Sequence, residues 1–131
     1  MAQNEDVVRR VYESWGAGDI PGPVELLDPD IEYVNPVGAI EPGTRSGVAA
    51  FTAALETVFE AYEYWRTEVE SLEPIGDHVV AVVAYTLKGR GSGLEIRGRE
   101  SALWTLRDGK VLRYEWFHGV DDARSAAEAG R

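Results

Sequence analysis

Two ionisable side chains, Glu100 and His118, have the types and the spacing that acid–base chemistry requires. Glu100 is the one acidic residue at the even-numbered positions of the alternating segment 94–106, whose other even positions are apolar or glycine. A carboxyl group on an apolar face loses hydration, so its pKa rises unless a partner stabilises the charge. His118 ends the next alternating segment, and an imidazole beside such a carboxyl group can exchange protons with it. A purely structural ion pair is the alternative interpretation.

The connection at Asp108-Gly109 decides whether these two residues share a face. A two-residue turn would place Trp104 opposite a polar residue and mix the two faces, whereas a three-residue loop pairs even-numbered with even-numbered residues. The sequence therefore predicts the three-residue loop, with Trp104 opposite Leu112. In that register Glu100 and His118 become diagonal neighbours, with roughly 7–8 Å between their backbones.

Apolar spacing along the rest of the chain predicts helices mainly in the first half and strands mainly in the second. The expected helices are Asn4–Gly18, one from Ser46 to Tyr62 and a closing one at Asp121–Ala129. A short helix is also expected at Ile20–Leu27, but its two prolines weaken it, and the alternative is a single turn. A short strand is expected at Asp30–Asn35, followed by a loop through Gly38, Pro42 and Gly43. Antiparallel hairpins are expected from the strands Glu63–Leu72, Val79–Leu87, Leu94–Arg107 and Lys110–His118.

Composition narrows the classes of function. A length of 131 residues fits a single domain over residues 1–131, and a formal charge of −10 makes nucleic acid and anionic membranes unfavourable partners. Without a long apolar run or a signal-like N-terminus, a cytoplasmic location is expected. The sequence has no cysteine and two histidines, so no metal site is expected. The glycine-rich segment 89–93 lacks the Lys-Ser/Thr of a phosphate loop, and no cofactor is expected.

Several short motifs follow one another over nearly the whole chain. They are Val8-Arg9-Arg10-Val11-Tyr12, Gly18-Asp19-Ile20, Asp28-Pro29-Asp30-Ile31-Glu32-Tyr33-Val34-Asn35-Pro36, Ser46-Gly47-Val48-Ala49-Ala50-Phe51 and Asp108-Gly109-Lys110-Val111. In this order the sequence resembles the nuclear transport factor 2-like superfamily, and within it the SnoaL-like and ketosteroid-isomerase-like domains. The resemblance implies a cone-shaped α+β fold, in which a curved antiparallel or mixed sheet packs on N-terminal helices around an apolar pocket. It also implies dimerisation through the outer face of the sheet.

The catalytic residues of ketosteroid isomerases are missing at the positions that the resemblance assigns to them. The segment Asn35-Pro36-Val37-Gly38 is similar to their Asp-Pro-x-Gly motif, but an amide cannot act as the base. Their oxyanion-hole Tyr and protonated Asp fall at Val11 and Ala102, which donate no side-chain hydrogen bond. That isomerase mechanism is therefore not expected.

Two further enzyme types of the superfamily match only in part. The acid and the His of the SnoaL-like polyketide cyclases fall at Trp116 and Ala102, which cannot replace them. The Tyr-x-Asn with which limonene epoxide hydrolases orient a water is similar to Tyr33-Val34-Asn35. Their Asp-Arg-Asp relay falls at Ala84, Thr86 and Trp116, so only the water-holding part is retained.

The candidate site is an apolar pocket with a few polar groups. Its expected catalytic residues are Glu100, His118, Asn35 and Tyr33. Its expected ligand-binding lining is Trp15, Phe59, Trp65, Ala102, Trp104, Tyr114 and Trp116. The alternative is that the aromatic residues, Trp65 and Phe59 above all, only fill the core.

Three hypotheses follow for function. The first is a cofactor-free isomerase, cyclase or hydrolase of a small apolar substrate, favoured because an inward Glu-His pair is costly to keep unused in an apolar cavity. The second is a module that binds a small hydrophobic ligand without chemistry, favoured by the missing family catalysts. The third is a dimeric interaction protein with a filled core. A homodimer is expected because the segment Val79–Leu87 is apolar on both faces.

Overall fold

The computed structural model describes residues 3–36 and 43–130, in which three α-helices pack on a six-stranded sheet. The helices are α1 (Asn4–Gly16), α2 (Val48–Ala61) and α3 (Asp122–Glu128), with one 3-10 turn, η1 (Val24–Leu26). The strands are β1 (Leu27–Asn35), β2 (Gly43–Ser46), β3 (Tyr62–Ile75), β4 (His78–Gly89), β5 (Glu95–Arg107) and β6 (Lys110–Phe117). The predicted α+β fold is confirmed. No helix within these residues is long and apolar enough to cross a bilayer.

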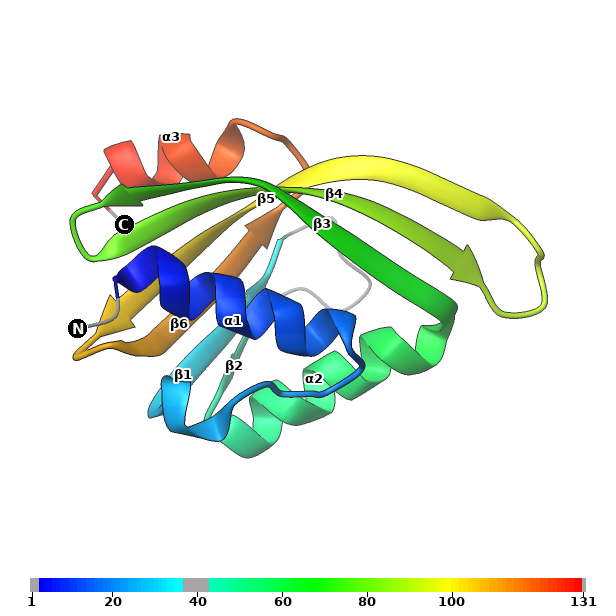
Figure 1. Cartoon of the computed structure of the whole chain (residues 1–131), viewed down its shortest axis with the longest axis horizontal. Coiled ribbons are helices and arrows are strands. Elements are labelled where there is room, and N and C mark those ends of the chain that lie inside the picture. Colours follow the sequence, from blue (N-terminus) through cyan, green and yellow to red (C-terminus); the bar gives the residue numbers. More distant parts are fainter. Residues whose placement is uncertain (1–2, 37–42, 131) are drawn as a thin grey trace.

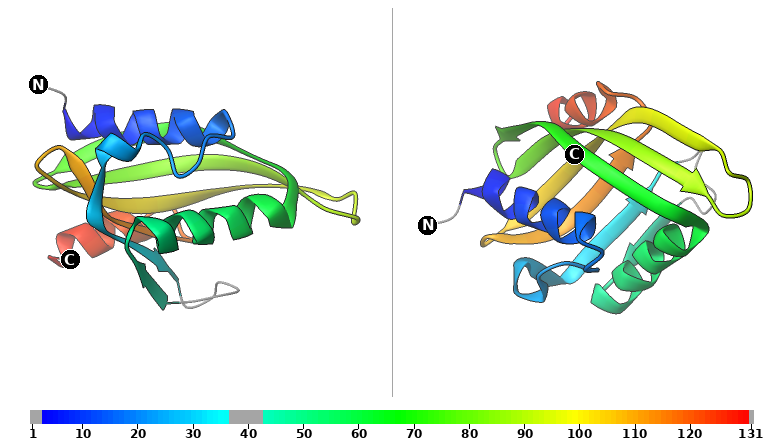
Figure 2. Two further views of the ribbon diagram at one scale, coloured as in Figure 1. Left: turned by 90° about the horizontal axis from the view of Figure 1, so that it is seen from below. Right: turned by 45° about the vertical axis from the view of Figure 1, so that its right-hand side comes forward.

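The sheet has the strand order β2-β1-β6-β5-β4-β3, and only the β1–β6 pair is parallel. It curves around α1 and α2, while α3 lies on the opposite face, and the hairpin of β4 and β5 extends beyond the helices (Figures 1 and 2). Strand β2 was not predicted, because the residues Gly43–Ser46 are small or polar and show no apolar alternation. The predicted loop positions Gly38 and Pro42 lie outside the described residues.

The segment Ile20–Leu27 forms a single turn, which is the shorter of the two outcomes expected for it. Only the three residues of η1 are helical, and β1 begins at Leu27. Pro21 and Pro23 carry no backbone N–H and restrict the residues before them, so a longer helix lacks the donors that it needs.

The connection between β5 and β6 is a two-residue turn followed by a bulge, and the predicted three-residue loop is wrong. Arg107 pairs with Lys110, so that only Asp108 and Gly109 lie between the strands, with positive φ values of 54° and 76°. Two positive φ values at these positions are typical of a type I′ hairpin turn. Leu112 is then the extra residue of a β-bulge in β6.

The bulge restores the pairing of even-numbered with even-numbered residues. Trp104 therefore pairs with Tyr114 rather than with Leu112, and the face on which these residues lie is the inner one, as predicted. If the same register is continued, Glu100 lies level with His118, the first residue after β6. The predicted inner face is thus correct, although the predicted loop was wrong by one residue.

An aromatic cluster fills the inner face of the sheet under α1. The rings of Tyr12, Trp15, Trp104 and Tyr114 have centroids 4.5–5.6 Å apart, mostly in edge-on or tilted contacts. The Trp104 indole N–H donates a hydrogen bond to the Tyr12 hydroxyl at 3.1 Å, and that of Trp15 donates to the Pro21 carbonyl at 3.0 Å. Because its buried indole groups are paired, the cluster forms a stable wall next to the open part of the cone.

The outer face of the sheet is partly covered by α3. The alanines of this helix pack with Val80 and Leu103 in a second, smaller cluster. Ser101 of β5 contacts the start of this helix, and its side chain is fully buried. Its hydroxyl donates to the Gly119 carbonyl at 2.5 Å and accepts a hydrogen bond from the Ala123 amide at 3.1 Å. Ser101 therefore attaches the start of α3 to the sheet.

We predict that Ser101→Ala lowers the free energy of unfolding by about 1–3 kcal/mol, because it leaves the buried amide of Ala123 without its acceptor. Urea unfolding followed by circular dichroism measures this change. Ser71→Ala, at an exposed position of β3, serves as the control and should change stability by less than about 0.5 kcal/mol. Equal effects of the two substitutions would contradict the role of Ser101.

Candidate functional site

The concave face holds a cavity of about 330 Å³ between α2 and the strands. This volume lies at the lower end of the range for small-molecule sites, which is roughly 300–1,000 Å³. The residues that line it come from α2, from every strand except β2 and, with His118, from the segment after β6. They are Tyr33, Asn35, Ala54, Thr57, Val58, Ala61, Tyr62, Trp65, Tyr85, Leu87, Glu100, Tyr114, Trp116 and His118.

Glu100 is the acidic residue of this lining. No hydrogen bond or ion pair joins its carboxyl group to another residue in the described parts of the chain. Burial alone raises its pKa from 4.5 to about 7, since removing water penalises the charged form. The neutral and the ionised forms are therefore both populated near pH 7, which is what a proton-transferring group requires.

Three tyrosines of the interior respond to the charge of Glu100. Burial raises the pKa of Tyr33 to about 12, and it raises the pKa values of Tyr12 and Tyr114 even further; in all three the Glu100 charge adds to the effect. The hydroxyl groups of these tyrosines thus remain protonated over the whole physiological pH range. They can donate hydrogen bonds, but they cannot neutralise the carboxylate.

His118 lines the same cavity but is exposed, which places it at the mouth. Its ring meets the Trp116 ring edge-on, with centroids 4.9 Å apart. The two residues predicted as an acid–base pair, Glu100 and His118, therefore share the cavity. No hydrogen bond or ion pair joins them in the structure, and the raised pKa of Glu100 comes from burial and not from the imidazole.

Asn35 and Tyr33 lie at the end of β1 and also line the cavity. The Trp116 indole N–H donates a hydrogen bond to the Asn35 Oδ1 atom at 2.6 Å, which fixes the orientation of the amide. Tyr33 is 3% exposed and packs between Phe51 and Tyr114, with ring centroids 5.6 and 5.4 Å away. The cavity thus has a rigid polar corner on an aromatic support.

Several lining residues were not found from the sequence, among them Tyr85 and Leu87 of β4. Both occupy odd positions of a strand that is apolar on both faces, so its pattern did not show which face is the inner one; the pairing of its odd positions with the even positions of β5 decides this. The Tyr85 ring lies over Gly98 of the paired strand. A Cβ atom at Gly98 would lie 2.5 Å from the Tyr85 hydroxyl oxygen and 2.6 Å from its Cζ atom. Glycine at position 98 therefore makes the room that this ring occupies.

Comparison with known proteins identifies the family. The sequence matches the model of the SnoaL-like domain over residues 8–114. The chain belongs to the SnoaL-like domain family. No curated protein sequence matches it significantly.

Solved structures share the fold of this SnoaL-like domain. TerC, in a crystal structure with polyporic acid, is 25% identical, with a TM-score of 0.79 over 95% of this chain and 98% of TerC. An NTF2-like protein of unknown function from Burkholderia pseudomallei is 21% identical, with a TM-score of 0.81 over 93% and 95% of the two chains. A candidate SnoaL-like polyketide cyclase from Jannaschia sp. CCS1 is 22% identical, with a TM-score of 0.77 over 98% and 93%. The family match confirms the predicted SnoaL-like domain, and the solved structures confirm the predicted cone-shaped fold.

Four of the residues predicted to line the pocket of this SnoaL-like domain do not line the cavity. Ala102 and Trp104 of β5 are 1% and 0% exposed, and Trp15 of α1, which is 2% exposed, packs against Trp104 and so fills this part of the cone. Phe59 packs edge-on against Trp65 at a centroid distance of 5.3 Å and supports the wall from behind. The other predicted lining residues, Trp65, Tyr114 and Trp116, do line it.

The described residues provide few ligands for a metal ion and few positive charges for a phosphate group near the cavity. They contain no cluster of three histidine, aspartate or glutamate side chains that could hold a metal ion. The lining contains one carboxyl group and one imidazole, and no lysine or arginine of the described segments lines the cavity. Acid–base chemistry is what this set of side chains can perform.

The SnoaL-like domain should lose stability as the pH rises from about 4.5 to 7. The folded state keeps the Glu100 proton up to a pKa of about 7, whereas the unfolded chain releases it near the ordinary value of 4.5. The folded state binds more protons in this window, so raising the pH across it costs up to about 3 kcal/mol. Glu100→Gln should remove this loss. Urea unfolding at several pH values between 4 and 8 measures it.

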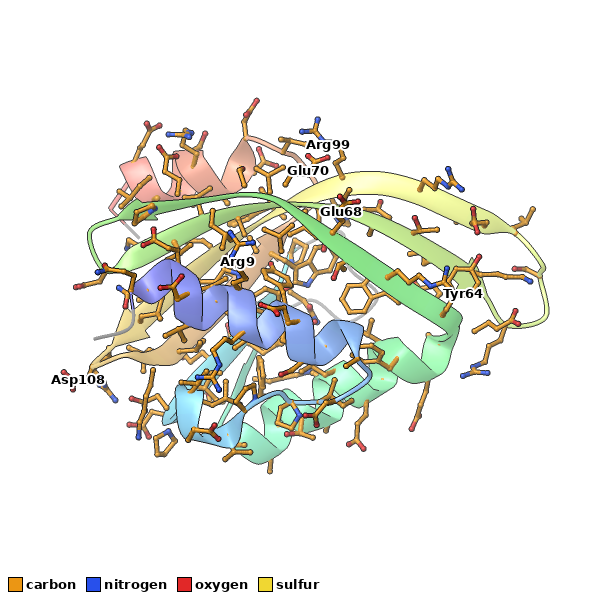
Figure 3. The ribbon with its side chains drawn as sticks, in the orientation of Figure 1. Arg9, Tyr64, Glu68, Glu70, Arg99 and Asp108 are labelled. Carbon is orange, nitrogen blue, oxygen red and sulfur yellow. The ribbon has the colours of Figure 1, made fainter. Side chains whose placement is uncertain are left out.

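Glu68→Gln on the exposed side of β3 is the matched control for that substitution (Figure 3). It removes the same carboxyl group from a position outside the cavity, so the wild-type pH dependence should persist. A Glu100→Gln protein whose stability follows the wild-type curve would show that the pKa of Glu100 is not raised.

Gly98→Ala should destabilise the protein by about 1–3 kcal/mol, because the added methyl group displaces the Tyr85 ring. A second substitution, Tyr85→Leu, should recover most of this loss, since it removes the atoms that the methyl group meets. Gly16→Ala, where an added Cβ atom meets nothing within 4 Å, is the neutral control. Thermal unfolding compares the variants, and losses that simply add in the double variant would contradict the proposed contact.

Proposed function

We propose that this SnoaL-like domain binds a small, largely apolar molecule and exchanges a proton with it through Glu100, in an isomerase-, cyclase- or hydrolase-type reaction that needs no cofactor. Membership of the SnoaL-like family supports a function of the small-molecule isomerase or cyclase type. The proposed proton transfer rests on Glu100. Its carboxyl group lies in an apolar, aromatic wall and has no hydrogen-bond partner among the described residues.

A carboxyl group with a pKa near 7 can act in both directions. As the neutral acid, Glu100 donates its proton to a substrate oxygen, nitrogen or double bond, and the carboxylate remains. As the carboxylate, it accepts a proton from an adjacent atom of the substrate and becomes neutral again. A cycle of both steps moves a proton within the substrate and returns Glu100 to its starting state, so an isomerisation or cyclisation consumes no further reactant, whereas a hydrolysis consumes one water molecule.

The neighbouring polar groups are suited to hold the substrate. Tyr33 keeps its hydroxyl proton because burial raises its pKa, and Asn35 is oriented by the indole of Trp116. Both lie on the wall formed by β1, where they can hold a carbonyl group or a water molecule. His118 at the mouth can exchange protons between the cavity and water.

A module that binds its ligand without chemistry is the second candidate function. It is supported by the residues at the positions that the family resemblance assigns to catalysts, since Val11 and Ala102 are buried and apolar. Trp116, at a third such position, already donates its indole N–H to Asn35. TerC, which shares this fold, was co-crystallised with polyporic acid, and this supports the view that a domain of this fold can bind a small organic molecule.

The expected homodimer remains a proposal, as does the absence of nucleic-acid and membrane partners. Strand β4 is apolar on both faces, and its outer face favours a partner surface. Its outer residue Val80 is already covered by α3, whereas Val82 and Ala84 on the same face are only half-buried. A partner would therefore contact the part of the outer face that α3 leaves uncovered.

Deuterium exchange of 2-tetralone, a bicyclic ketone, tests the proton transfer. In D2O near neutral pH, the wild-type protein should accelerate exchange at the carbon next to the carbonyl group, as followed by proton NMR. Glu100→Gln should lower the protein-catalysed rate by about 100-fold or more, because general acid–base catalysis contributes roughly 10²–10⁴-fold. Glu68→Gln should exchange at the wild-type rate.

Binding of the same ketone, followed by the fluorescence of Trp65 and Trp116, separates the two candidate functions. Binding without accelerated exchange would support the binding module and contradict catalysis by Glu100. A wild-type protein to which 2-tetralone does not bind, with exchange at the buffer rate, would contradict both.

A further inference from the structure

Charge is distributed unevenly around the cavity. Among its lining residues, Glu100 is the one acid and His118 is the one residue that can become positively charged. No lysine or arginine in the described segments of the chain lines the cavity, and the whole chain has a formal charge of −10. An anionic ligand would therefore meet a carboxyl group and no fixed positive charge.

The lining is also rich in aromatic rings. Six phenol or indole rings contribute to it, from Tyr33, Tyr62, Trp65, Tyr85, Tyr114 and Trp116. The face of such a ring carries partial negative charge and attracts a cation, most strongly where water is excluded. The aromatic rings and the carboxylate of Glu100 thus both favour a positive charge on the ligand.

The basic residues of the strands lie away from this wall. Arg99 occupies an odd position of β5, on the face opposite to Glu100 (Figure 3). There its guanidinium group forms an ion pair with the Glu70 carboxylate, with an N–O distance of 2.7 Å. Arg45 of β2 pairs with Tyr33 in the sheet and slightly offsets the rise of the Tyr33 pKa, but it does not line the cavity. The carboxyl group is therefore left without a cationic partner in the wall.

We propose that the molecule selected by this cavity is an organic cation, an amine with an apolar body, whose positive charge lies between the Glu100 carboxylate and the surrounding aromatic rings. This inference rests on the proposed function and names the class of ligand for the same site. The ammonium group supplies the counter-charge that the wall lacks, and the apolar body fills the rest of the cavity.

The proposal predicts competition between the cation and a proton for Glu100. Affinity for a permanent cation should rise as the pH increases through about 7, since only the carboxylate attracts it. Tyr12, Tyr33 and Tyr114 face the same region and stay neutral in this range because their pKa values are raised. His118 is the remaining group that could respond, and a protonated imidazole would also repel a cation, so a substitution of Glu100 must accompany the pH series.

Three probes of nearly the same shape test this charge selectivity. They are benzyltrimethylammonium, which is cationic, neopentylbenzene, which is neutral, and phenylmethanesulfonate, which is anionic. At pH 8 the wild-type protein should bind the ammonium probe at least tenfold more tightly than the neutral one, and the sulfonate more weakly than either. Titration calorimetry and the fluorescence of Trp65 and Trp116 measure the dissociation constants.

Glu100→Gln keeps the shape of the wall and removes its charge. In this variant the preference for the ammonium probe should fall to threefold or less, while the affinity for neopentylbenzene stays within twofold of the wild-type value. Glu68→Gln changes the net charge of the chain by the same amount from outside the cavity, so it should retain the tenfold preference.

The possible failures separate this inference from the proposed function. If neopentylbenzene binds as tightly as the ammonium probe, or the sulfonate binds best, the cation inference is wrong while a pocket for small apolar molecules remains. If the preference for the cation survives Glu100→Gln, the assignment of the charge contact to Glu100 is wrong. If none of the three probes binds and 2-tetralone does not bind either, the proposed function fails together with the inference.

Discussion

The loss of water around one carboxyl group is the constraint on which the site depends. Glu100 lies on an inner face whose other side chains are apolar or aromatic, and no described residue pairs with it. A fold keeps such a group only if the rest of the core is stable enough to offset its cost. The cluster of Tyr12, Trp15 and Trp104 provides this stability next to the cavity, because its large rings are buried with their indole groups hydrogen-bonded. The part of the cone under α1 is filled so that the part beside α2 can stay open.

Much of the fold could be predicted from the sequence, since local patterns determine it. Apolar residues at helical spacing located α1 and α2, and alternation located the long strands and the face on which Glu100 lies. Two features of the fold were not predicted, and each has a physical reason. The strand β2 consists of glycine and polar residues that pair at the edge of the sheet without an apolar face. The turn at Asp108-Gly109 has the residues typical of a two-residue hairpin, but the compensating bulge at Leu112 depends on packing further along the strands and has no local signal.

The site was predictable only in outline, because alternation tells which face a residue occupies but not what covers that face. Glu100 and Trp104 share the inner face of β5, yet α1 packs over Trp104 and leaves Glu100 at the cavity. The same limit applies to the lining from α2, such as Thr57 and Val58, whose position relative to the sheet is set by tertiary packing. The polar residues of the cavity wall could therefore be identified from the sequence better than the full set of residues that line it.

The β-bulge at Leu112 also affects how the hairpin can tolerate changes in length. Up to Thr105 and Arg113 the strands pair residue by residue, and the single extra residue is absorbed between these pairs and the turn. A deletion of one residue at Leu112 would leave Arg113 opposite Thr105 and would keep every later side chain of β6 on its present face. An insertion within the strand beyond the bulge would instead reverse the faces of the residues that follow it. Within this hairpin, a change of one residue in length is thus compatible with an unchanged cavity wall only on the turn side of Arg113.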